Sequence, residues 1–360
     1  MITKPTLLID KEKCQKNIRK MALKAEKQQL IFRPHFKTHQ SIEIGNWFKA
    51  FGVKKITVSS LDMAMYFSKD WNDITVAFPV NILEIKQINQ LARTITLNIL
   101  IESIDTVSFL EAHLQSPVNF FIKIDVGYNR TGVSPHHTDK INNILKASNA
   151  SSLLTFKGFL AHAGHTYQCR SKQEIIDVHE KALSLFTPLK KQFSTLYPDL
   201  ILSYGDTPSC SVSDNFNGID EIRPGNFVFY DLTQHYIGSN TINEIAVTMV
   251  CPIVAIHPEK NEILIYGGGV HFSKDYLILE EDKKIYGLII DPTTNTPTRC
   301  IPDTYLKSIS QEHGIIAVPE QDISQYNIGQ LIHILPVHAC MTANSMKKYI
   351  TNSQKTIERL

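Results

Sequence analysis

The sequence lacks the long apolar runs that a membrane protein needs. No stretch approaches about 18 uninterrupted apolar residues, so no transmembrane helix is expected. The opening stretch MITKPTLLIDKEK has Pro5 and two acidic residues where a signal peptide would have its apolar region. The cysteines are scattered without paired spacing, which predicts reduced thiols and not a disulfide framework. These absences predict a cytoplasmic protein.

An excess of charge of one sign is also absent. The chain has 37 basic and 35 acidic side chains and a formal net charge of +2. This balance argues against nucleic acid and membrane surfaces as partners. At 360 residues, with 43% of them hydrophobic, the chain exceeds the size at which one hydrophobic core usually stops growing. Two domains are therefore expected.

The first two-thirds of the chain alternates short apolar runs with amphipathic segments. Thr6–Ile9 is predicted to be a short strand, and Asp10 to be the N-cap of the helix that follows. Helices such as Ile82–Ala92 and Glu174–Phe193 are predicted between most of the later strands. This alternation predicts an α/β fold with a parallel (β/α)₈ barrel. The eight barrel strands are predicted at Leu30–Phe32, Lys55–Val58, Ile74–Phe78, Leu97–Ile101, Phe120–Lys123, Phe156–Ala161, Ile201–Ser203 and Phe227–Tyr230.

From Asn243 onwards the pattern changes to strands joined by loops that contain Pro, Asn and Gly. We therefore predict a barrel over residues 11–242 and a mainly β domain over residues 243–360, to which residues 1–10 also belong. The strands of this domain are predicted at Ala246–Ile256, Glu262–Tyr266, Lys284–Ile290, Gly314–Val318 and Gln330–Leu335.

Polar loops lie next to the predicted barrel strands, and barrel enzymes gather their active residues on the loops at the carboxyl ends of the strands. Arg33–His39 follows the first strand, Asp125–Gly132 the fifth, and Arg223–Asn226 precedes the predicted eighth. A lysine beside two histidines, as at Lys37, is by itself usually a solvated cation. Backbone N–H groups and a hydroxyl in the glycine-containing loops are suited to a phosphate. These phosphate candidates are Gly205, Asp206, Thr207 and Gly225.

The run Arg33–His39 resembles the cofactor-lysine motif of the D-serine dehydratase and D-threonine aldolase family, which shares the fold of alanine racemase. Lys123–Gly132, Arg223–Gly225 and His338–Cys340 resemble further motifs of that family, in the same order. The resemblance implies that Lys37 binds pyridoxal 5'-phosphate as a Schiff base.

It also implies that Arg130 reaches the phenolic oxygen of the cofactor and that Arg223 faces the pyridine nitrogen. Because an arginine there keeps its proton, the ring nitrogen is expected to stay unprotonated. The complete predicted cofactor site is Lys37, His35, Arg130, Tyr167, Ser203, Gly205, Asp206, Thr207, Arg223, Gly225, Asn226 and Tyr230.

His338 and Cys340 are two residues apart, so on an extended segment both side chains would project to one face and could bind one ion. Imidazole with thiolate is a zinc pairing, although a His-x-Cys by spacing alone is more often incidental. In the family that the chain resembles, the dehydratases carry His-x-Cys and the aldolases typically carry His-x-Asp. Zinc is therefore the expected metal, with manganese or magnesium as alternatives.

One segment departs from the family pattern. Tyr266–Asp275 differs from the Asp-Ala-Gly type of sequence that is common at this point, and its three glycines suit either a phosphate nest or a tight turn. This departure places the chain in a divergent branch.

The resemblance implies β-elimination from a D-serine-like substrate to a keto acid and ammonia. It also implies a homodimer in which the β domain of one chain helps to close the barrel mouth of the other. The main alternative is retro-aldol cleavage of D-threonine-like substrates. An amino-acid racemase and a non-catalytic cofactor-binding protein are less favoured alternatives. A racemase has no use for a metal at the β-carbon, and a non-catalytic cofactor-binding protein tends to lack the β domain and the metal pair.

Overall fold

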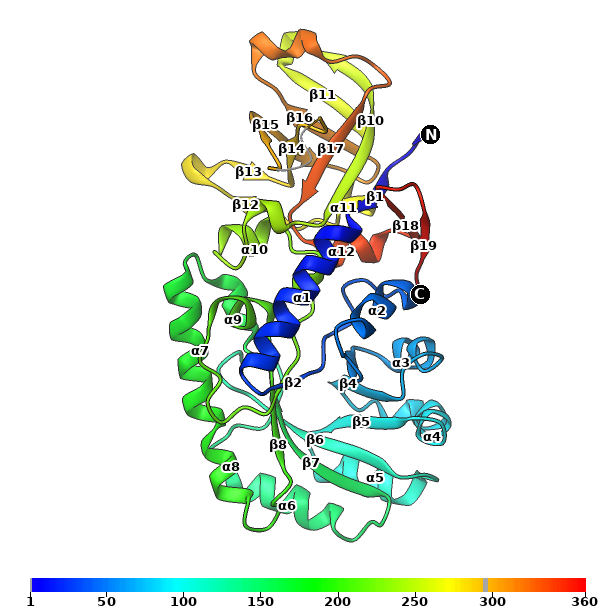
Figure 1. Cartoon of the computed structure of the whole chain (residues 1–360), viewed down its shortest axis with the longest axis vertical. Helices are drawn as coiled ribbons and strands as arrows, with labels where there is room; N and C mark the ends of the chain where they lie inside the picture. The colour runs from blue at the N-terminus through cyan, green and yellow to red at the C-terminus, as the bar shows by residue number, and fades with distance from the viewer. Residues whose placement is uncertain (1, 294–296) are drawn as a thin grey trace. The chain divides into compact units, whose positions relative to one another are not determined.

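The computed structural model describes residues 2–293 and 297–360. Its contacts divide the chain into two units (Figure 1). The barrel unit comprises Arg19–Lys37, Ile44–Gly225 and Leu360, and the β unit comprises Met1–Ile18, Thr38–Glu43 and Asn226–Arg359. The domain boundary at residue 242 stays a prediction. Within the described ranges no helix has the length and apolar character needed to cross a membrane.

The barrel unit is built on eight parallel strands that curl into a closed sheet, as predicted. Neighbouring strands pair in the order β2-β9-β8-β7-β6-β5-β4-β3. A parallel bridge between His35 and Thr57 joins the two edges of the sheet. The strands are β2 Ile31–Phe32, β3 Ile56–Val58, β4 Asp73–Pro79, β5 Thr96–Ile101, β6 Val118–Ile124, β7 Leu154–Ala161, β8 Ile201–Tyr204 and β9 Glu221–Ile222.

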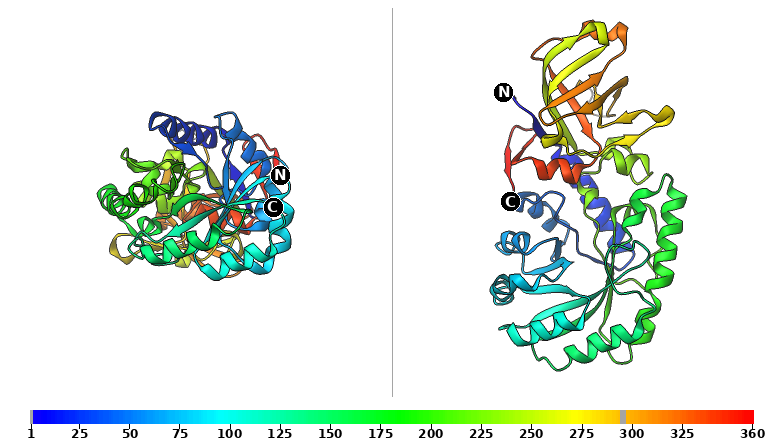
Figure 2. Two further views of the ribbon diagram at one scale, coloured as in Figure 1. Left: turned by 90° about the horizontal axis from the view of Figure 1, so that it is seen from below. Right: turned by 180° about the vertical axis from the view of Figure 1, so that it is seen from behind.

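Helices lie outside the ring of strands, as the end-on view shows (Figure 2, left). Ser60, Ser103 and Ser171 begin three of them, each hydroxyl accepting a backbone N–H three residues on. The predicted helix Glu174–Phe193 is two helices, because Pro188 begins the second. The helices are α1 Lys11–Lys27, α2 Ile42–Lys49, α3 Leu61–Phe67, α4 Ile85–Ala92, α5 Ile104–His113, α6 Thr138–Ser148, α7 Lys172–Phe186, α8 Pro188–Phe193 and α9 Thr207–Val212.

The predicted eighth strand is wrong. Phe227–Tyr230 is an apolar aromatic run, but Asn226–Val228 is a 3₁₀ helix and the eighth strand is β9, Glu221–Ile222. β9 contains a buried glutamate, so its sequence does not read as an apolar run. The correction moves Arg223–Gly225 from the start of a strand to its carboxyl end, which is the active end of such barrels.

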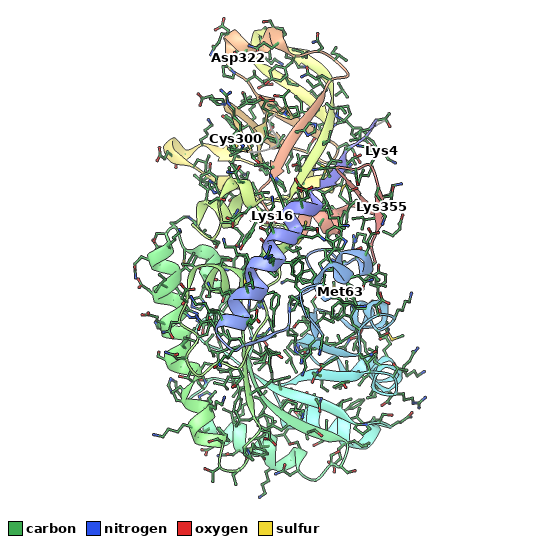
Figure 3. The ribbon with its side chains drawn as sticks, in the orientation of Figure 1. Lys4, Lys16, Met63, Cys300, Asp322 and Lys355 are labelled. Atoms are coloured by element: carbon green, nitrogen blue, oxygen red, sulfur yellow. The ribbon has the colours of Figure 1, made fainter. Side chains whose placement is uncertain are left out.

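The β unit is dominated by a nine-stranded sheet with the order β11-β16-β15-β14-β17-β10-β1-β18-β19. The predicted strand Thr6–Ile9 is β1, which pairs antiparallel with β10. The Asp10 carboxylate then accepts the Lys13 N–H at 3.0 Å and begins α1, whose exposed face carries Lys16 (Figure 3). The other strands of the sheet are β10 Val247–His257, β11 Glu262–Tyr266, β14 Gly287–Ile290, β15 Cys300–Ile309, β16 His313–Ala317, β17 Leu331–Pro336, β18 Lys348–Thr351 and β19 Thr356–Glu358.

Strand β15 was not predicted, and neither were β18 and β19 in the tail. Pro302 and Asp303 interrupt the sequence of β15, and Asp303 has a positive φ of 50°. These residues disfavour a strand locally, but pairing with β14 and β16 on either side forms it. The smaller elements of this unit are α10 Leu232–Tyr236, α11 Gly269–Phe272, β12 Leu277–Ile278, β13 Lys284–Ile285 and α12 Ala339–Ser345.

Candidate active site

The predicted cofactor residues of the barrel unit lie at or just beyond the carboxyl ends of its strands. Arg33–Lys37 follows β2, Asp125–Gly132 follows β6, and Arg223–Gly225 follows β9. Tyr167 lies in a 3₁₀ helix after β7, and Ser203 lies in β8 itself. In a parallel barrel all these ends lie on one rim. The barrel therefore brings the predicted residues of this unit to the same side.

Lys37 is exposed, whereas Phe36 and Thr38 beside it are buried. The Phe36 ring packs against Phe48 and Trp71, with ring centroids 5.0 and 5.2 Å away. The backbone N–H of Lys37 donates to Nδ1 of His35 at 3.3 Å. An anchored aromatic side chain and a local hydrogen bond thus fix the backbone that carries the exposed amine.

Positive side chains gather in the barrel around a neutral histidine. Burial, together with the charges of Arg223 and Arg130, lowers the pKa of Lys123 to about 7. Burial also lowers the pKa of His162 well below its ordinary value, and the charges of Lys123, Lys37 and Arg223 act in the same direction. The His162 ring therefore donates from Nδ1 to the Gly205 carbonyl oxygen, at 2.6 Å, as a neutral imidazole. Such a concentration of positive charge suits an anionic ligand.

Arg223 is buried and held by three hydrogen bonds. Its Nε donates to Oγ of Ser203 at 2.7 Å, and its Nη2 donates to the carbonyl oxygens of Ala161 and Ser203 at 2.5 and 3.3 Å. Burial lowers its pKa to about 10, so the side chain keeps its charge near neutral pH. Its Nη1 has no partner among the described residues, and a guanidinium can only donate. This arrangement fits an unprotonated pyridine nitrogen.

The loops after β8 and β9 approach each other closely at the predicted phosphate site. A Cβ atom on Gly205, whose φ is +159°, would lie 2.7 Å from the backbone nitrogen of Arg223, so only glycine fits there. The Gly225 N–H donates to the Thr207 hydroxyl at 3.2 Å, and that hydroxyl donates its own proton to no described residue. The donor set that results fits a phosphate group.

The Asp206 carboxylate has a different role from its neighbours. It accepts the Ser209 N–H at 2.7 Å and the Thr166 hydroxyl at 3.0 Å, and so caps α9. Burial raises its pKa. The Asp206 side chain thus has a structural role at the start of α9, and its part in phosphate binding stays a prediction.

Tyr128 is a site residue that the sequence reasoning missed. The Arg130 guanidinium lies 4.8 Å from the centroid of the Tyr128 ring. The same ring stacks on His165 and covers Gly164, where a Cβ atom would lie 2.4 Å from it. Tyr128 thus supports the arginine that was predicted to reach the phenolic oxygen. The glycine at position 164 is the one sequence signal for this contact.

The predicted metal pair lies in the β unit, but not on an extended segment. His338 follows β17 and occupies the N-cap position of α12, and Cys340 lies in the first turn of that helix. The sequence argument from strand alternation was therefore wrong. The two side chains nevertheless lie within hydrogen-bonding reach of each other, and this contact helps to raise the pKa of His338.

The partners of the pair were not predicted. The Asp275 carboxylate lies 2.8 Å from Nδ1 of His338, and the Asn226 amide and the Thr38 hydroxyl lie 3.5 and 3.3 Å from Sγ of Cys340. Burial alone would lower the pKa of His338, but its bonds to Asp275 and Cys340 raise it to about 11. Asn226, predicted as a cofactor residue, thus contacts the thiol of the metal pair.

The backbone between the two side chains is also held in place. The Asp231 carboxylate accepts the Ala339 N–H at 2.9 Å and the Asn226 amide at 2.6 Å. Tyr230, just before it, is buried and has a positive φ of 49°. These contacts fix the turn on which His338 and Cys340 lie.

Within residues 2–293 and 297–360 no group of three or more His, Cys, Asp or Glu side chains could hold a metal. A metal here would have two protein ligands, an imidazole and a thiolate, which is a donor set suited to zinc. A carboxylate on the other nitrogen of a metal-binding histidine is the usual outer partner, and Asp275 has that place. The pair therefore fits zinc with open positions for water and substrate.

The glycines of Tyr266–Asp275 serve packing. A Cβ atom on Gly267 would lie 2.5 Å from Sγ of Cys251, and one on Gly268 would lie 2.4 Å from the Gln311 carbonyl oxygen. The close approach to these neighbours accounts for the two glycines without a phosphate nest.

Comparison with known proteins matches nearly the whole chain. The family model of the alanine racemase N-terminal domain matches residues 9–232, and that of a serine dehydratase domain matches residues 246–352. The D-serine dehydratase of Dictyostelium discoideum is 31% identical over 98% of this chain and 94% of its own. The D-threo-3-hydroxyaspartate dehydratase of Delftia sp. (strain HT23) is 26% identical over 99% of this chain and 97% of its own.

The structure of that Delftia enzyme superposes on this chain with a TM-score of 0.91, 25% identity, and coverage of 100% of this chain and 98% of its own. Solved structures of a D-threo-3-hydroxyaspartate dehydratase include a variant with a histidine replaced by alanine. They also include a metal-free form with a cysteine two positions later replaced by alanine. An alanine racemase of Clostridium difficile matches with a TM-score of 0.71 at 11% identity, over 100% of both chains, which shows the fold alone.

Proposed function

The chain belongs to the D-serine dehydratase family, and from this membership we propose that it is a pyridoxal-phosphate-dependent lyase that eliminates water from a D-serine-like β-hydroxy amino acid. The products are a keto acid and ammonia, because the aminoacrylate released by the elimination hydrolyses. The observation that carries the proposal is the pair His338 and Cys340, with Asp275 bonded to the imidazole.

The barrel unit supplies the residues that would hold the cofactor. Lys37 would bind it covalently, Arg130 its phenolic oxygen and Arg223 its ring nitrogen. Thr207, with the backbone of Gly205 and Gly225, would bind its phosphate. When bound, pyridoxal phosphate withdraws electrons from the α-carbon of the substrate and so makes the α-proton acidic.

Lys37 would also be the general base. With substrate in place its amine would be available near the α-carbon, where it would accept the α-proton. Arg223 keeps its charge near neutral pH and cannot transfer its proton to the ring nitrogen, so the electron-withdrawing power of the ring is limited. Such a site benefits from a second device that eases departure of the β-hydroxyl.

That device would be the metal pair. His338 and Cys340 would hold zinc, or else manganese or magnesium, and Asp275 would keep the imidazole oriented. A metal held there supplies a Lewis acid that neutralises charge on the departing hydroxyl. Thr38 and Asn226 each contact the thiol, and they would keep it in place.

We also propose that the protein works in the cytoplasm. All six cysteines lie in the described ranges and none of them forms a disulfide. Free thiols suit a reducing compartment.

Product analysis on D-serine, D-threonine and D-threo-3-hydroxyaspartate tests the proposal, with L-serine and the Lys37→Ala variant as controls. Keto acid and ammonia from a D-substrate are the expected products. Glycine and an aldehyde would instead make the chain an aldolase, and D-to-L conversion would make it a racemase. A protein that binds the cofactor but turns over none of these substrates would contradict the proposal.

A further inference from the structure

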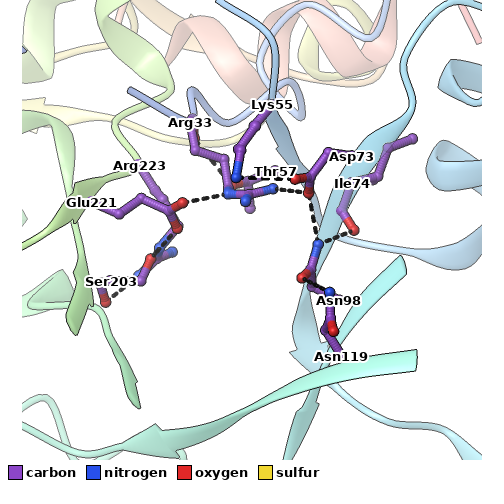
Figure 4. A network of polar contacts seen from close by, with 10 residues as sticks. All are labelled: Arg33, Lys55, Thr57, Asp73, Ile74, Asn98, Asn119, Ser203, Glu221 and Arg223. Atoms are coloured by element: carbon purple, nitrogen blue, oxygen red, sulfur yellow. Dashed lines mark hydrogen bonds and ion pairs between the residues drawn. The ribbon is translucent and has the colours of Figure 1, made fainter. Parts of the chain in front are cut away.

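Inside the barrel unit a line of hydrogen-bonded side chains connects Arg33 with Arg223 (Figure 4). Nε of Arg33 donates to Oε2 of Glu221 at 2.6 Å, and the Ser203 hydroxyl donates to Oε1 of Glu221 at 2.6 Å. Nε of Arg223 donates to the same hydroxyl at 2.7 Å. At the other end, Nη1 of Arg33 donates to the Asp73 carboxylate at 2.6 Å.

The line depends on strand register. Ser203 of β8 is paired directly with Glu221 of β9, so the two side chains are neighbours on the sheet. A serine hydroxyl can donate one proton and accept others, which lets it join the glutamate to the guanidinium. Among the described residues Arg223 has no direct carboxylate partner. The Ser203 hydroxyl is therefore its link to a negative charge.

Glu221 is fully buried, and each of its two oxygens has one partner. A buried carboxylate is stable only when it is paired and hydrogen-bonded. Burial is the largest influence on the pKa of Arg223, and Glu221 is the strongest of the charges that oppose it. Glu221 thus serves Arg33 directly and Arg223 through Ser203.

We infer that Glu221, acting through Ser203, is a positioning residue that helps to hold Arg223 in its contact with the cofactor. This inference rests on the proposed function, since it requires that Arg223 faces the bound cofactor. If the network only stabilised the barrel, removal of the Glu221 charge and removal of the Asp73 charge should affect cofactor binding in the same way. The inference assigns them different roles, because Glu221 reaches Arg223 and Asp73 does not.

The test compares Glu221→Gln and Ser203→Ala with Asp73→Asn as the matched control. Asp73→Asn removes a charge from the same network, next to Arg33, and leaves the bonds of Arg223 in place. Each protein is stripped of cofactor and titrated with pyridoxal 5'-phosphate, and the dissociation constant, the visible absorbance spectrum and Tm are measured. Ser203→Ala breaks the link without changing any charge, so it also serves if Glu221→Gln folds poorly.

Glu221→Gln and Ser203→Ala are expected to weaken cofactor binding about tenfold or more, which corresponds to about 1.4 kcal/mol, and to shift the visible band. Asp73→Asn is expected to lower Tm while its dissociation constant stays within about twofold of wild type and its spectrum is unchanged. Wild-type spectrum and affinity in Ser203→Ala would overturn the inference alone. A wild-type protein that takes up no cofactor would overturn the proposed function with it.

Discussion

Removing the Asp275 carboxylate should weaken metal binding at His338 and Cys340. The distance of 2.8 Å between Oδ2 of Asp275 and Nδ1 of His338 is that of a charge-assisted hydrogen bond. This bond fixes the ring and leaves its other nitrogen for a metal. Two replacements separate the parts of the interaction, because Asp275→Asn keeps an acceptor and loses the charge, whereas Asp275→Ala loses both.

The expected size follows from the surroundings of the carboxylate. Outer partners of metal-binding histidines typically contribute about 10- to 100-fold in metal affinity. The Asp275 side chain is 47% exposed, so water can replace part of its bond. The carboxylate also favours the protonated imidazole, and protons compete with the metal. We therefore expect the lower end of the range, about tenfold or about 1.4 kcal/mol for Asp275→Ala, and a smaller loss for Asp275→Asn.

Competition between the protein and a coloured chelator for zinc measures this affinity independently of turnover. Asp303→Asn is a suitable control, because Asp303 is 80% exposed in an ion pair with Lys283. The control should bind zinc as the wild type does. Zinc affinity of Asp275→Ala within about twofold of wild type would refute the reasoning, since it would mean that His338 needs no outer partner.

The remaining predictions concern the cofactor, the metal, pH and assembly. The purified protein should be yellow, and Lys37→Ala should lose both the visible absorbance and all turnover; borohydride fixation of the cofactor to another lysine would contradict the assignment. Cys340→Asp replaces soft sulfur by hard oxygen, so zinc should weaken relative to manganese and products should shift in part towards retro-aldol cleavage. Lys123 has a pKa of about 7 in the folded protein against an ordinary value of 10.5, so the unfolded chain binds more protons between these values and stability rises with pH across that window. Denaturant titrations of the cofactor-free protein measure this effect as the difference in free energy of unfolding between the wild type and Lys123→Met. As the pH rises from 7 towards 10, the wild type should gain up to about 1.4 kcal/mol per pH unit relative to the variant. No relative gain would contradict the lowered pKa of Lys123. Sedimentation should show a homodimer, and an active monomer at micromolar concentration would exclude it.

The alternation of apolar runs and amphipathic segments was enough to predict the barrel, strand β1 before it, and the strands β10, β11, β14, β16 and β17 after it. This pattern is local, because strand and helix periods appear within a few residues. The same holds for the cap at Asp10, whose carboxylate bonds only three residues away. The prediction failed where the local pattern pointed the wrong way. Phe227–Tyr230 is apolar without being a strand, and the short β9 contains Glu221.

Only the tertiary structure decided which partners surround the predicted site residues. Asp275 and His338 are 63 positions apart, and Ser203 and Glu221 are 18 apart, so no local period connects them. The register of β8 against β9 places Ser203 beside Glu221. Asp275 and His338 meet because the segment after α11 lies next to the segment after β17. The sequence by itself determined which residues have the chemistry to act, since that depends on side-chain type. It could not determine what orients them, because those hydrogen bonds form only when strands distant in the chain are aligned.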